Sequence, residues 1–277
     1  MPVHSVGRIL LDSGKLAEHD IEEILRVMDA RRVRFGEAAV QLRLVTREDV
    51  EAALAMQFEY PYLARGEGGY HADLVAAFDP FSPKVEALRV IRSQLMIGGL
   101  GDNGKRLAVV SPGPGEGRSF VAANLAVVFS QLGSRTLLVD ADFRSSRQHH
   151  LFRLANSLGL SSFLAGRAEL SDVVHRVPHF KDLSVIPAGA PPPNPQELLG
   201  RQLFSEALAE LEADYDLILF DTPDGTFTAD AQVVASHSQQ VLMVTRRHAT
   251  RLAGARVLSD RLTRTGVQIL GAVLNTG

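Results

Sequence analysis

The sequence predicts a mainly parallel α/β domain with helices on both sides of the sheet, preceded by a small all-helical domain. From residue 84 onward, six short apolar runs alternate with helical segments, which is the pattern of βαβ units. The first apolar run leads through a Gly-rich loop into a helix. Before residue 64 the chain instead repeats a helical pattern at a constant offset of 29 residues.

Length and composition restrict the class of protein. A chain of 277 residues at about 150 per domain predicts roughly two domains. Hydrophobic residues at 45% and charged residues at 22% are typical of globular proteins and exclude disordered and fibrous classes. A net charge of −3 argues against a protein that coats nucleic acid or binds membranes through a polybasic surface.

The absence of cysteine excludes disulfides, thiolate metal sites and thiol catalysis, and it fits a reducing compartment. No apolar run approaches the roughly 18 residues of a membrane span. The first residues also lack the apolar region of a signal peptide. We therefore expect a cytoplasmic protein.

Residues 1–63 contain the repeat. Gly7 corresponds to Gly36 and Asp20 to Asp49, and each copy predicts a short helix, a turn and a second helix with apolar residues at i, i+3 and i+4. We expect both aspartates one position inside the second helix, where the helix dipole favours negative charge. Two such units would bury their apolar faces against each other and form a small helical domain.

The stretch 64–83 carries several glycines and prolines and is interpreted as a linker or a wrapping arm. Residues 84–277 form the second predicted domain. Pro83 is expected to open a helix that runs to about Met96, and another helix is expected over 118–132. The predicted strands are 106–111, 136–140, 183–187, 217–221, 240–245 and 268–275.

The loop after the first strand has the composition of a phosphate-binding loop. A Gly-rich turn between a strand and a helix presents backbone N–H groups and a helix N-terminus to phosphate. The usual P-loop has Lys where this chain has Arg118, so the loop taken alone is also compatible with a simple Gly/Pro turn. The residues expected to bind nucleotide are Gly113, Pro114, Gly115, Glu116, Gly117, Arg118, Ser119 and Phe120.

Two further strands end in carboxylates. Asp140 and Asp142 close one apolar run, and Asp221 closes another. A single aspartate at a strand end is usually a turn residue or a cap. Because ligands bind at the carboxyl ends of parallel strands, three acids beside a phosphate loop instead predict a site for Mg²⁺ and a nucleotide. The fold class predicted is therefore a P-loop NTPase.

The segment from about Pro80 to Asn275 resembles the cytoplasmic domain of the bacterial tyrosine kinases (BY-kinases) of polysaccharide export. Within that family the resemblance is strongest to the stand-alone tyrosine autokinases of exopolysaccharide chain-length systems, which also carry an N-terminal helical domain. Three segments of this chain resemble the nucleotide-binding motifs of that family: Walker A (114–119), Walker A′ (140–144, with His149 and Phe152) and Walker B (221–223). Residues 189–199 resemble a further segment typical of the family, and Glu86, Arg89 and Arg92 resemble its ring-assembly helix motif.

The resemblance implies a mechanism that uses ATP and Mg²⁺. Loop N–H groups with Arg118 would hold the β- and γ-phosphates, and Ser119, Asp142 and Asp221 would order Mg²⁺. Asp140 would act as the base or aligner for an attacking tyrosine hydroxyl. The catalytic residues implied are thus Asp140, Asp142 and Arg118.

The resemblance also implies partners. A membrane chain-length determinant, the polysaccharide co-polymerase, would stimulate the kinase and hold it at the inner membrane. Copies of the chain would assemble through Glu86, Arg89 and Arg92, although such residues more often form a solvated helix face with i,i+3 pairs. No nucleic acid is expected as a ligand.

Two departures from the family pattern bear on activity. Arg118 is longer than Lys and fork-shaped, so the exchange is not conservative, yet the chain has 25 arginines and four lysines and favours Arg throughout. The sequence runs to Gly277, close to the last predicted strand, and autophosphorylation of a tyrosine-rich tail is not expected. Its tyrosines are Tyr60, Tyr62, Tyr70 and Tyr215.

These departures leave a second interpretation open, a catalytically weak ATP-binding scaffold of the export machinery. A third, a partitioning or positioning ATPase, ranks last because that group has an extra Lys near the loop start, where this chain has Gly113. The stretch 246–264 holds six arginines and one acid and predicts a basic helix, either solvated or in contact with anionic lipid.

The N-terminal repeat resembles the N-terminal domain of type II secretion ATPases, some of which bind cyclic di-GMP through a tandem motif. Arg34, Gly36 and Gln57 match the second copy of that motif, whereas Ser5 and Met28 depart from it in the first copy. The repeat therefore predicts either a cyclic di-GMP site or a plain protein-docking domain, and the second is favoured.

Overall fold

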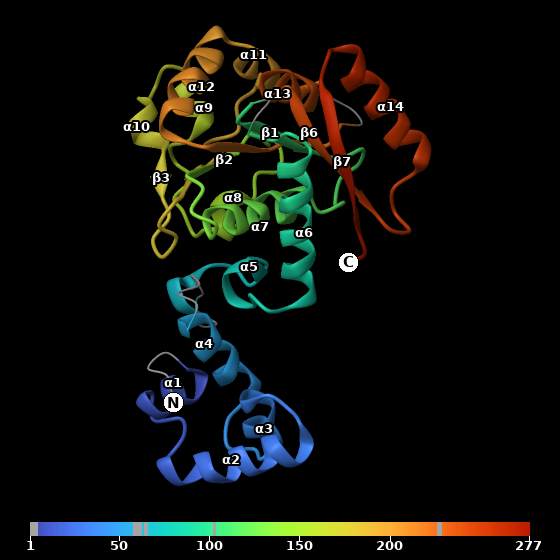
Figure 1. The fold of residues 1–277 in the computed structure, drawn as a ribbon. Coiled ribbons are helices and arrows are strands. Elements are labelled where there is room, and N and C mark those ends of the chain that lie inside the picture. The colour runs from blue at the N-terminus through green and yellow to red at the C-terminus, as the bar shows by residue number, and fades with distance from the viewer. Residues whose placement is uncertain (1–4, 58–62, 64–65, 102–103, 226–228) are drawn as a thin grey trace. The chain divides into compact units, whose positions relative to one another are not determined.

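The computed structural model describes residues 5–57, 63, 66–101, 104–225 and 229–277. The chain divides into two compact units, Met1–Ala64 and Arg65–Gly277 (Figure 1). Within the residues described, none of the helices has the length and apolar character needed to cross a membrane.

The first unit contains four helices, two from each copy of the repeat. They are α1 (Val6–Asp12), α2 (Glu18–Arg31), α3 (Phe35–Gln41) and α4 (Arg47–Gln57). α1 packs on α4 and α2 on α3, so the two copies interlock and do not stand side by side as separate hairpins. Their shared core consists of Leu10, Leu16, Ile24, Ala38, Ala39, Val45 and Ala53.

The two repeat aspartates lie deeper in their helices than expected. Asp20 occupies the third position of α2, and its carboxylate accepts a hydrogen bond from the Ala17 N–H at 2.7 Å. Asp49 occupies the third position of α4 and accepts from the Thr46 N–H at 3.0 Å. The prediction of one position inside the helix is wrong, because an acid at the third position can reach back to the N-cap amide.

Residues 66–83 belong to the larger unit and pack on its α7, so they do not form a free linker. The segment includes α5 (Val75–Phe78), whose last three residues are buried, and it ends where α6 (Pro83–Ile97) begins. The Asn124 side chain accepts a hydrogen bond from the Ala76 N–H at 2.9 Å and donates one to the Asp73 carbonyl at 2.8 Å. Of the two interpretations of this segment, a wrapping arm describes these contacts.

The larger unit is built on a seven-stranded sheet in the order β3-β4-β2-β5-β1-β6-β7 within the described residues. Only the β3–β4 pair is antiparallel. The strands are β1 (Arg106–Val110), β2 (Thr136–Asp140), β3 (His175–Arg176), β4 (Leu183–Ile186), β5 (Leu217–Asp221), β6 (Gln240–Arg246) and β7 (Gln268–Asn275). The sequence does not predict β3, because two residues carry no periodic signal.

Helices cover both faces of the sheet, as the sequence predicts (Figure 1). α6 and α7 (Arg118–Ser130) lie on one face, and α7 is buried along most of its length. α12 (Gln202–Asp214), α13 (Asp230–Ser238) and α14 (Leu252–Arg264) cover the other face. The short helices are α8 (Gln148–Leu151), α9 (Leu160–Leu164), α10 (Leu170–Val173) and α11 (Pro195–Leu199).

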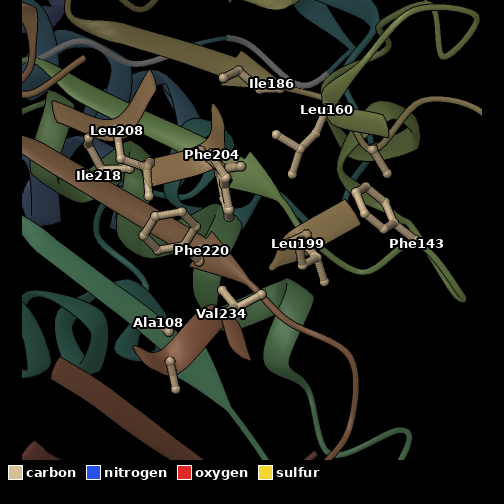
Figure 2. Close-up of a cluster of buried hydrophobic side chains, with 14 of the residues drawn as sticks. Ala108, Phe143, Leu160, Ile186, Leu199, Phe204, Leu208, Ile218, Phe220 and Val234 are labelled. Carbon is tan, nitrogen blue, oxygen red and sulfur yellow. The ribbon is translucent and has the colours of Figure 1, made fainter. Parts of the chain in front are cut away.

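The core between the sheet and α12–α14 is apolar and aromatic. Phe204 of α12 and Phe220 of β5 meet edge to face with ring centroids 6.1 Å apart, and Val234 of α13 lies next to them (Figure 2). This packing fixes β5, and therefore the carboxylate at its end, against the helical layer.

We predict that Asn124→Ala destabilises the larger unit by about 2 kcal/mol and lowers its melting temperature by roughly 4–8 °C. The variant leaves the buried Ala76 N–H and Asp73 carbonyl without their side-chain partner. Differential scanning calorimetry of the whole chain measures the shift. Asn194→Ala is the matched control, since Asn194 is exposed and makes no side-chain cap bond. Equal melting temperatures for the two variants would contradict the assigned role of Asn124.

Candidate nucleotide site

The loop between β1 and α7 has a backbone that only glycine adopts without strain. Gly115 and Gly117 have φ values of 69° and 102°. A Cβ atom at Gly117 would also collide with the side-chain amide of Asn275. The loop therefore turns tightly, and α7 begins directly after it, so that its N-terminus and the loop N–H groups serve one site.

Glu116 braces the loop from inside. Its carboxylate accepts hydrogen bonds from the Gly113 N–H at 3.0 Å and from the Thr250 hydroxyl at 2.5 Å. Its carbonyl accepts from the Asn275 side-chain amide at 3.0 Å. The shape of the loop thus depends on Thr250, between β6 and α14, and on Asn275 at the end of β7, both more than 130 positions away in sequence.

The Arg118 side chain is buried and folds back onto the loop. Its Nε donates to the Thr222 carbonyl at 2.8 Å, and one terminal nitrogen donates to the Ser111 hydroxyl and to the Gly113 carbonyl. The other terminal nitrogen lies 3.8 Å from Asp142 Oδ2. The predicted phosphate ligand therefore has its guanidinium directed at protein oxygens, in a pattern that the single ammonium of Lys could not match.

Two of the predicted carboxylates lie side by side. Asp140 ends β2 and Asp221 ends β5, and they are register partners in this parallel pair. Both side chains are completely buried, and Asp142, two residues on, is 2% exposed. Asp140 and Asp221 thus lie together at one end of the sheet, and Asp142 lies beside Arg118 of the loop helix.

Burial and the neighbouring negative charges raise the pKa values of the carboxyl groups at this site. Burial raises the pKa of Asp140 well above its usual value, and the neighbouring charge of Asp221 raises it further. Burial likewise raises the pKa of Asp221 to about 6, although hydrogen bonds from Gln148 and Ser119 act in the opposite direction. A bound cation would relieve both effects.

Asp140 organises the backbone that follows β2. Its Oδ1 accepts from the Asp142 N–H at 3.2 Å, and its Oδ2 accepts from the N–H groups of Arg147 and Gln148 at 3.1 and 3.0 Å. Three of its roughly four acceptor positions are therefore used by backbone amides. The role of base or aligner stays a prediction.

Gln148 is a site residue that the sequence reasoning missed. Its side-chain amide donates to Asp221 Oδ2 at 2.7 Å and to the Ser119 carbonyl at 3.2 Å, which joins the β5 carboxylate to the start of α7. A lone Gln at the start of a one-turn helix has no spacing or neighbour that marks it. Only the folded chain places it between the two motifs.

The oxygen atoms at this site are suited to Mg²⁺. Asp221 Oδ1 is buried and has no hydrogen-bond donor among the described residues, so a carboxylate oxygen remains for an ion. No three carboxylates or imidazoles of the described chain converge in a ready metal cluster. Mg²⁺ keeps several waters and binds through one or two carboxylates plus phosphate oxygens, so a hydroxyl from Ser119 with Asp142 and Asp221 is a fitting set.

A cavity of about 380 Å³ lies beside the loop on the side of α6 and α7. Phe120 and Val121 form one wall, and Arg246 and Asn275 lie at the ends of β6 and β7. The remaining predicted loop residue, Phe120, is thus placed at a pocket and not at the carboxylates. A mixed apolar and polar pocket of this size matches a small ligand.

The predicted assembly motif on α6 makes contacts within the chain. Arg89 pairs with Glu86 at 3.2 Å, and Arg92 donates to the Val128 carbonyl of α7 at 2.7 Å. The structure therefore pairs Glu86 with Arg89 on α6 and directs Arg92 to α7. Their part in assembly stays a prediction.

Known proteins resemble this chain in sequence and in fold. The family described as "AAA domain" matches residues 104–268. The chain is 35% identical to tyrosine-protein kinase YwqD of Bacillus subtilis over 203 residues, which is 73% of this chain and 85% of that protein. The chain belongs to the bacterial tyrosine-protein kinases. It is also 35% identical to tyrosine-protein kinase wzc of Salmonella typhimurium, but there the alignment spans only 28% of the relative.

Solved structures give the same result for the fold. The chimerical protein CapA2B2 superposes with a TM-score of 0.70 at 33% identity, over 74% of this chain and 90% of that one. The septum site-determining protein MinD of Pyrococcus horikoshii, solved with Mg-ADP, superposes with a TM-score of 0.54 at 26% identity, over 62% of this chain and 70% of that one. The predicted kinase family and P-loop fold are confirmed.

We predict that Asp221→Asn stabilises the metal-free protein at pH 7 by up to about 3 kcal/mol and has little effect at pH 4. The native pKa of about 6 lies above the usual 3.8, so the native state holds more protons between these values, and the stability that this group contributes is lost as pH rises through them. Urea unfolding with a chelator present measures the difference.

The control variant is expected to change the stability at pH 7 in the opposite direction. Arg135 lowers the pKa of Asp216, so Asp216→Asn should lose a little stability at pH 7 and none at low pH. Adding Mg²⁺ at pH 7 should stabilise the wild type and leave Asp221→Asn unchanged. If Asp221→Asn gains no stability between pH 4 and pH 7, the carboxylate is not held as described.

Proposed function

We propose that the chain is an ATP- and Mg²⁺-dependent protein tyrosine kinase that regulates exopolysaccharide polymerisation and export together with a membrane chain-length determinant. The observation that carries this proposal is the set of buried carboxylates at the ends of β2 and β5 beside the phosphate loop. The tyrosine-kinase names of the relatives support the acceptor, and the Mg-ADP bound by the structurally similar MinD supports the nucleotide.

Different residues of the proposed site position the phosphates, the metal ion and the acceptor hydroxyl. Loop N–H groups and the start of α7 cradle phosphate oxygens, and Ser119, Asp142 and Asp221 hold the metal ion. Mg²⁺, when bound, neutralises charge on the phosphates of the nucleotide. Arg118 supplies a positive charge at the loop, and Asp140 sets the loop that follows β2 and aligns the acceptor hydroxyl.

The acceptor tyrosine is proposed to lie on a partner. Tyr70 is buried, its hydroxyl donates to the Pro178 carbonyl at 2.5 Å, and burial raises its pKa, so it is poorly placed to receive a phosphoryl group. Tyr60 and Tyr62 lie outside the described residues. The membrane chain-length determinant would supply the tyrosine or stimulate the site, and it would hold the protein at the cytoplasmic side of the inner membrane.

One observation favours the second candidate, an ATP-binding scaffold with weak catalysis. The donors of Arg118 are directed at the carbonyls of Thr222 and Gly113, the hydroxyl of Ser111 and the carboxylate of Asp142. To reach a phosphate, the guanidinium must give up some of these buried contacts. This rearrangement has a cost that a Lys in the same position would not meet.

We expect the purified chain to transfer phosphate from labelled ATP, with Mg²⁺, to the cytoplasmic tail of its chain-length determinant. Asp140→Ala should lower the rate by at least about 100-fold, because the acceptor loses its aligning group. Phosphotyrosine and ADP are measured together. Asp214→Ala, at the exposed end of α12, is the control and should keep the full rate.

The same assay decides between the two candidates. If calorimetry shows that nucleotide binds, but neither phosphotyrosine nor ADP rises above the Asp140→Ala level, the kinase proposal is wrong and the scaffold remains. A melting curve for each variant shows that it is folded. Assembly through Glu86, Arg89 and Arg92 is tested separately by the mass of the Arg89→Ala variant in solution.

The N-terminal unit is proposed chiefly as a docking domain for a protein of the export machinery, with cyclic di-GMP as its alternative ligand. Arg34 is exposed at the start of α3, where a cationic side chain is accessible to a phosphate. If the alternative holds, calorimetry of the full chain with cyclic di-GMP gives heat that Arg34→Ala abolishes and that Arg26→Ala retains. No heat at tens of micromolar ends the cyclic di-GMP alternative.

A further inference from the structure

A strongly basic surface lies on α14 and at its N-terminal end. Residues 246–264 contain six arginines and a single acid, Asp260, although the whole chain has a net charge of −3. The average charge therefore does not reveal this local excess of positive charge. We call the exposed part of the helix the α14 surface, and it is defined by Arg251, Leu252, Arg256, Val257, Arg261 and Arg264.

The α14 surface faces outward at one end of the larger unit. α14 packs beside β7, the strand at the end of the sheet, and Figure 1 shows the helix at the outside of this unit. Its inward side is fixed by the buried Leu258 and Leu262. Leu252, Arg256 and Arg264 follow each other in one row of i, i+4 spacing, and all three are exposed. Arginine and aliphatic side chains are thus presented together to the surroundings.

The arginines of the α14 surface are not neutralised by acids of the chain. None of them forms an ion pair within the described residues, and neither does Asp260, which stands four positions from both Arg256 and Arg264. Other arginines of the larger unit each have a carboxylate partner at 2.7 to 3.8 Å, namely Arg106, Arg118, Arg135 and Arg144. The guanidinium groups on α14 are therefore available to an external anion.

The stability of the helix does not explain these charges. Arg251 is the N-cap of α14, and the first turn contains no acid. The helix dipole disfavours positive charge at this end. α6 and α13 instead carry Glu86 and Asp230 in their first turns. An anionic partner outside the chain would offset the repulsion that the arginine at the start of α14 experiences.

The helical layer that ends in α14 is electrically polarised. α12 contains four acids and no basic residue, whereas α14 contains three arginines and one acid. Charges separated in this way orient a molecule in front of a charged surface. An anionic surface would attract the side of the layer that carries α14 and repel the side that carries α12.

We propose that the α14 surface binds the anionic phospholipid headgroups of a membrane directly. Leu252 is 67% exposed and Val257 is 49% exposed, and both stand among the arginines. A membrane interface accepts both kinds of side chain, because acidic headgroups attract arginine and the acyl boundary accommodates leucine and valine. The phosphates of a nucleic acid would also attract the arginines but offer no apolar layer. This inference does not depend on the kinase function proposed above.

The first test is sedimentation of the full chain with lipid vesicles. The wild type should bind vesicles of equal parts phosphatidylglycerol and phosphatidylcholine but not pure phosphatidylcholine, and added NaCl should weaken binding by screening the charges. Arg256→Glu with Arg264→Glu should weaken binding at least about tenfold, because each arginine near an anionic surface adds to the attraction. The matched control, Arg167→Glu with Lys181→Glu, changes the net charge equally at exposed positions away from α14 and should bind within about twofold of wild type.

The second test removes the apolar side chains and keeps every charge. Leu252→Ser with Val257→Ser should weaken vesicle binding at least about fivefold, because the aliphatic groups no longer enter the acyl boundary. Leu132→Ser with Leu158→Ser alters two exposed leucines elsewhere in the larger unit and should have no effect. A melting curve shows that each variant is folded. Calorimetry with a non-hydrolysable ATP analogue should give the same nucleotide affinity for all of them.

Four outcomes overturn the inference. They are no binding of the wild type to phosphatidylglycerol vesicles at low salt, equal binding to pure phosphatidylcholine, equal loss in the two charge-reversal pairs, and tighter binding of the wild type to a DNA duplex than to the vesicles. If the serine pair at Leu252 and Val257 binds vesicles as tightly as wild type, the surface does not enter the membrane interface and the proposal is also wrong. None of these results changes the test of the kinase, which uses a soluble peptide tail.

Discussion

The rest of the nucleotide site depends on two carboxylates that the sheet forces together. Asp140 and Asp221 are register partners at the ends of β2 and β5, and both are fully buried. Burial raises the pKa of both carboxyl groups, and the charge of Asp221 raises that of Asp140 further, so the pair favours a nearby cation. The surrounding contacts serve this constraint, since Gln148 and three backbone amides supply hydrogen bonds to the pair.

The guanidinium of Arg118 lies next to the same negative charge. A lysine would place one compact charge in the loop, whereas the guanidinium spreads its donors over two carbonyls, a hydroxyl and the edge of Asp142. The loop is held in turn by Glu116, which is anchored by Thr250 after β6 and by Asn275 at the end of β7. Hydrogen bonds from outside the loop therefore hold its backbone in place.

α7 connects this site with the rest of the larger unit. It begins at the loop, lies buried on the sheet, and receives the wrapping arm through Asn124. Asp73 of the arm also lies 3.6 Å from Arg147, whose backbone amide binds Asp140. Contacts of the arm thus reach both the helix behind the phosphate loop and the segment that follows β2.

The sequence by itself determined the elements that local patterns encode. The apolar runs predicted six strands, the glycines and the three acids predicted the P-loop site, and the repeat predicted the four helices, because periodicity and turn chemistry act over a few neighbours. The tertiary structure alone decided the two-residue β3, the arm that packs onto α7, the role of Gln148 and the direction of Arg118. These features depend on strand register and on partners up to 104 positions away, which no local pattern records.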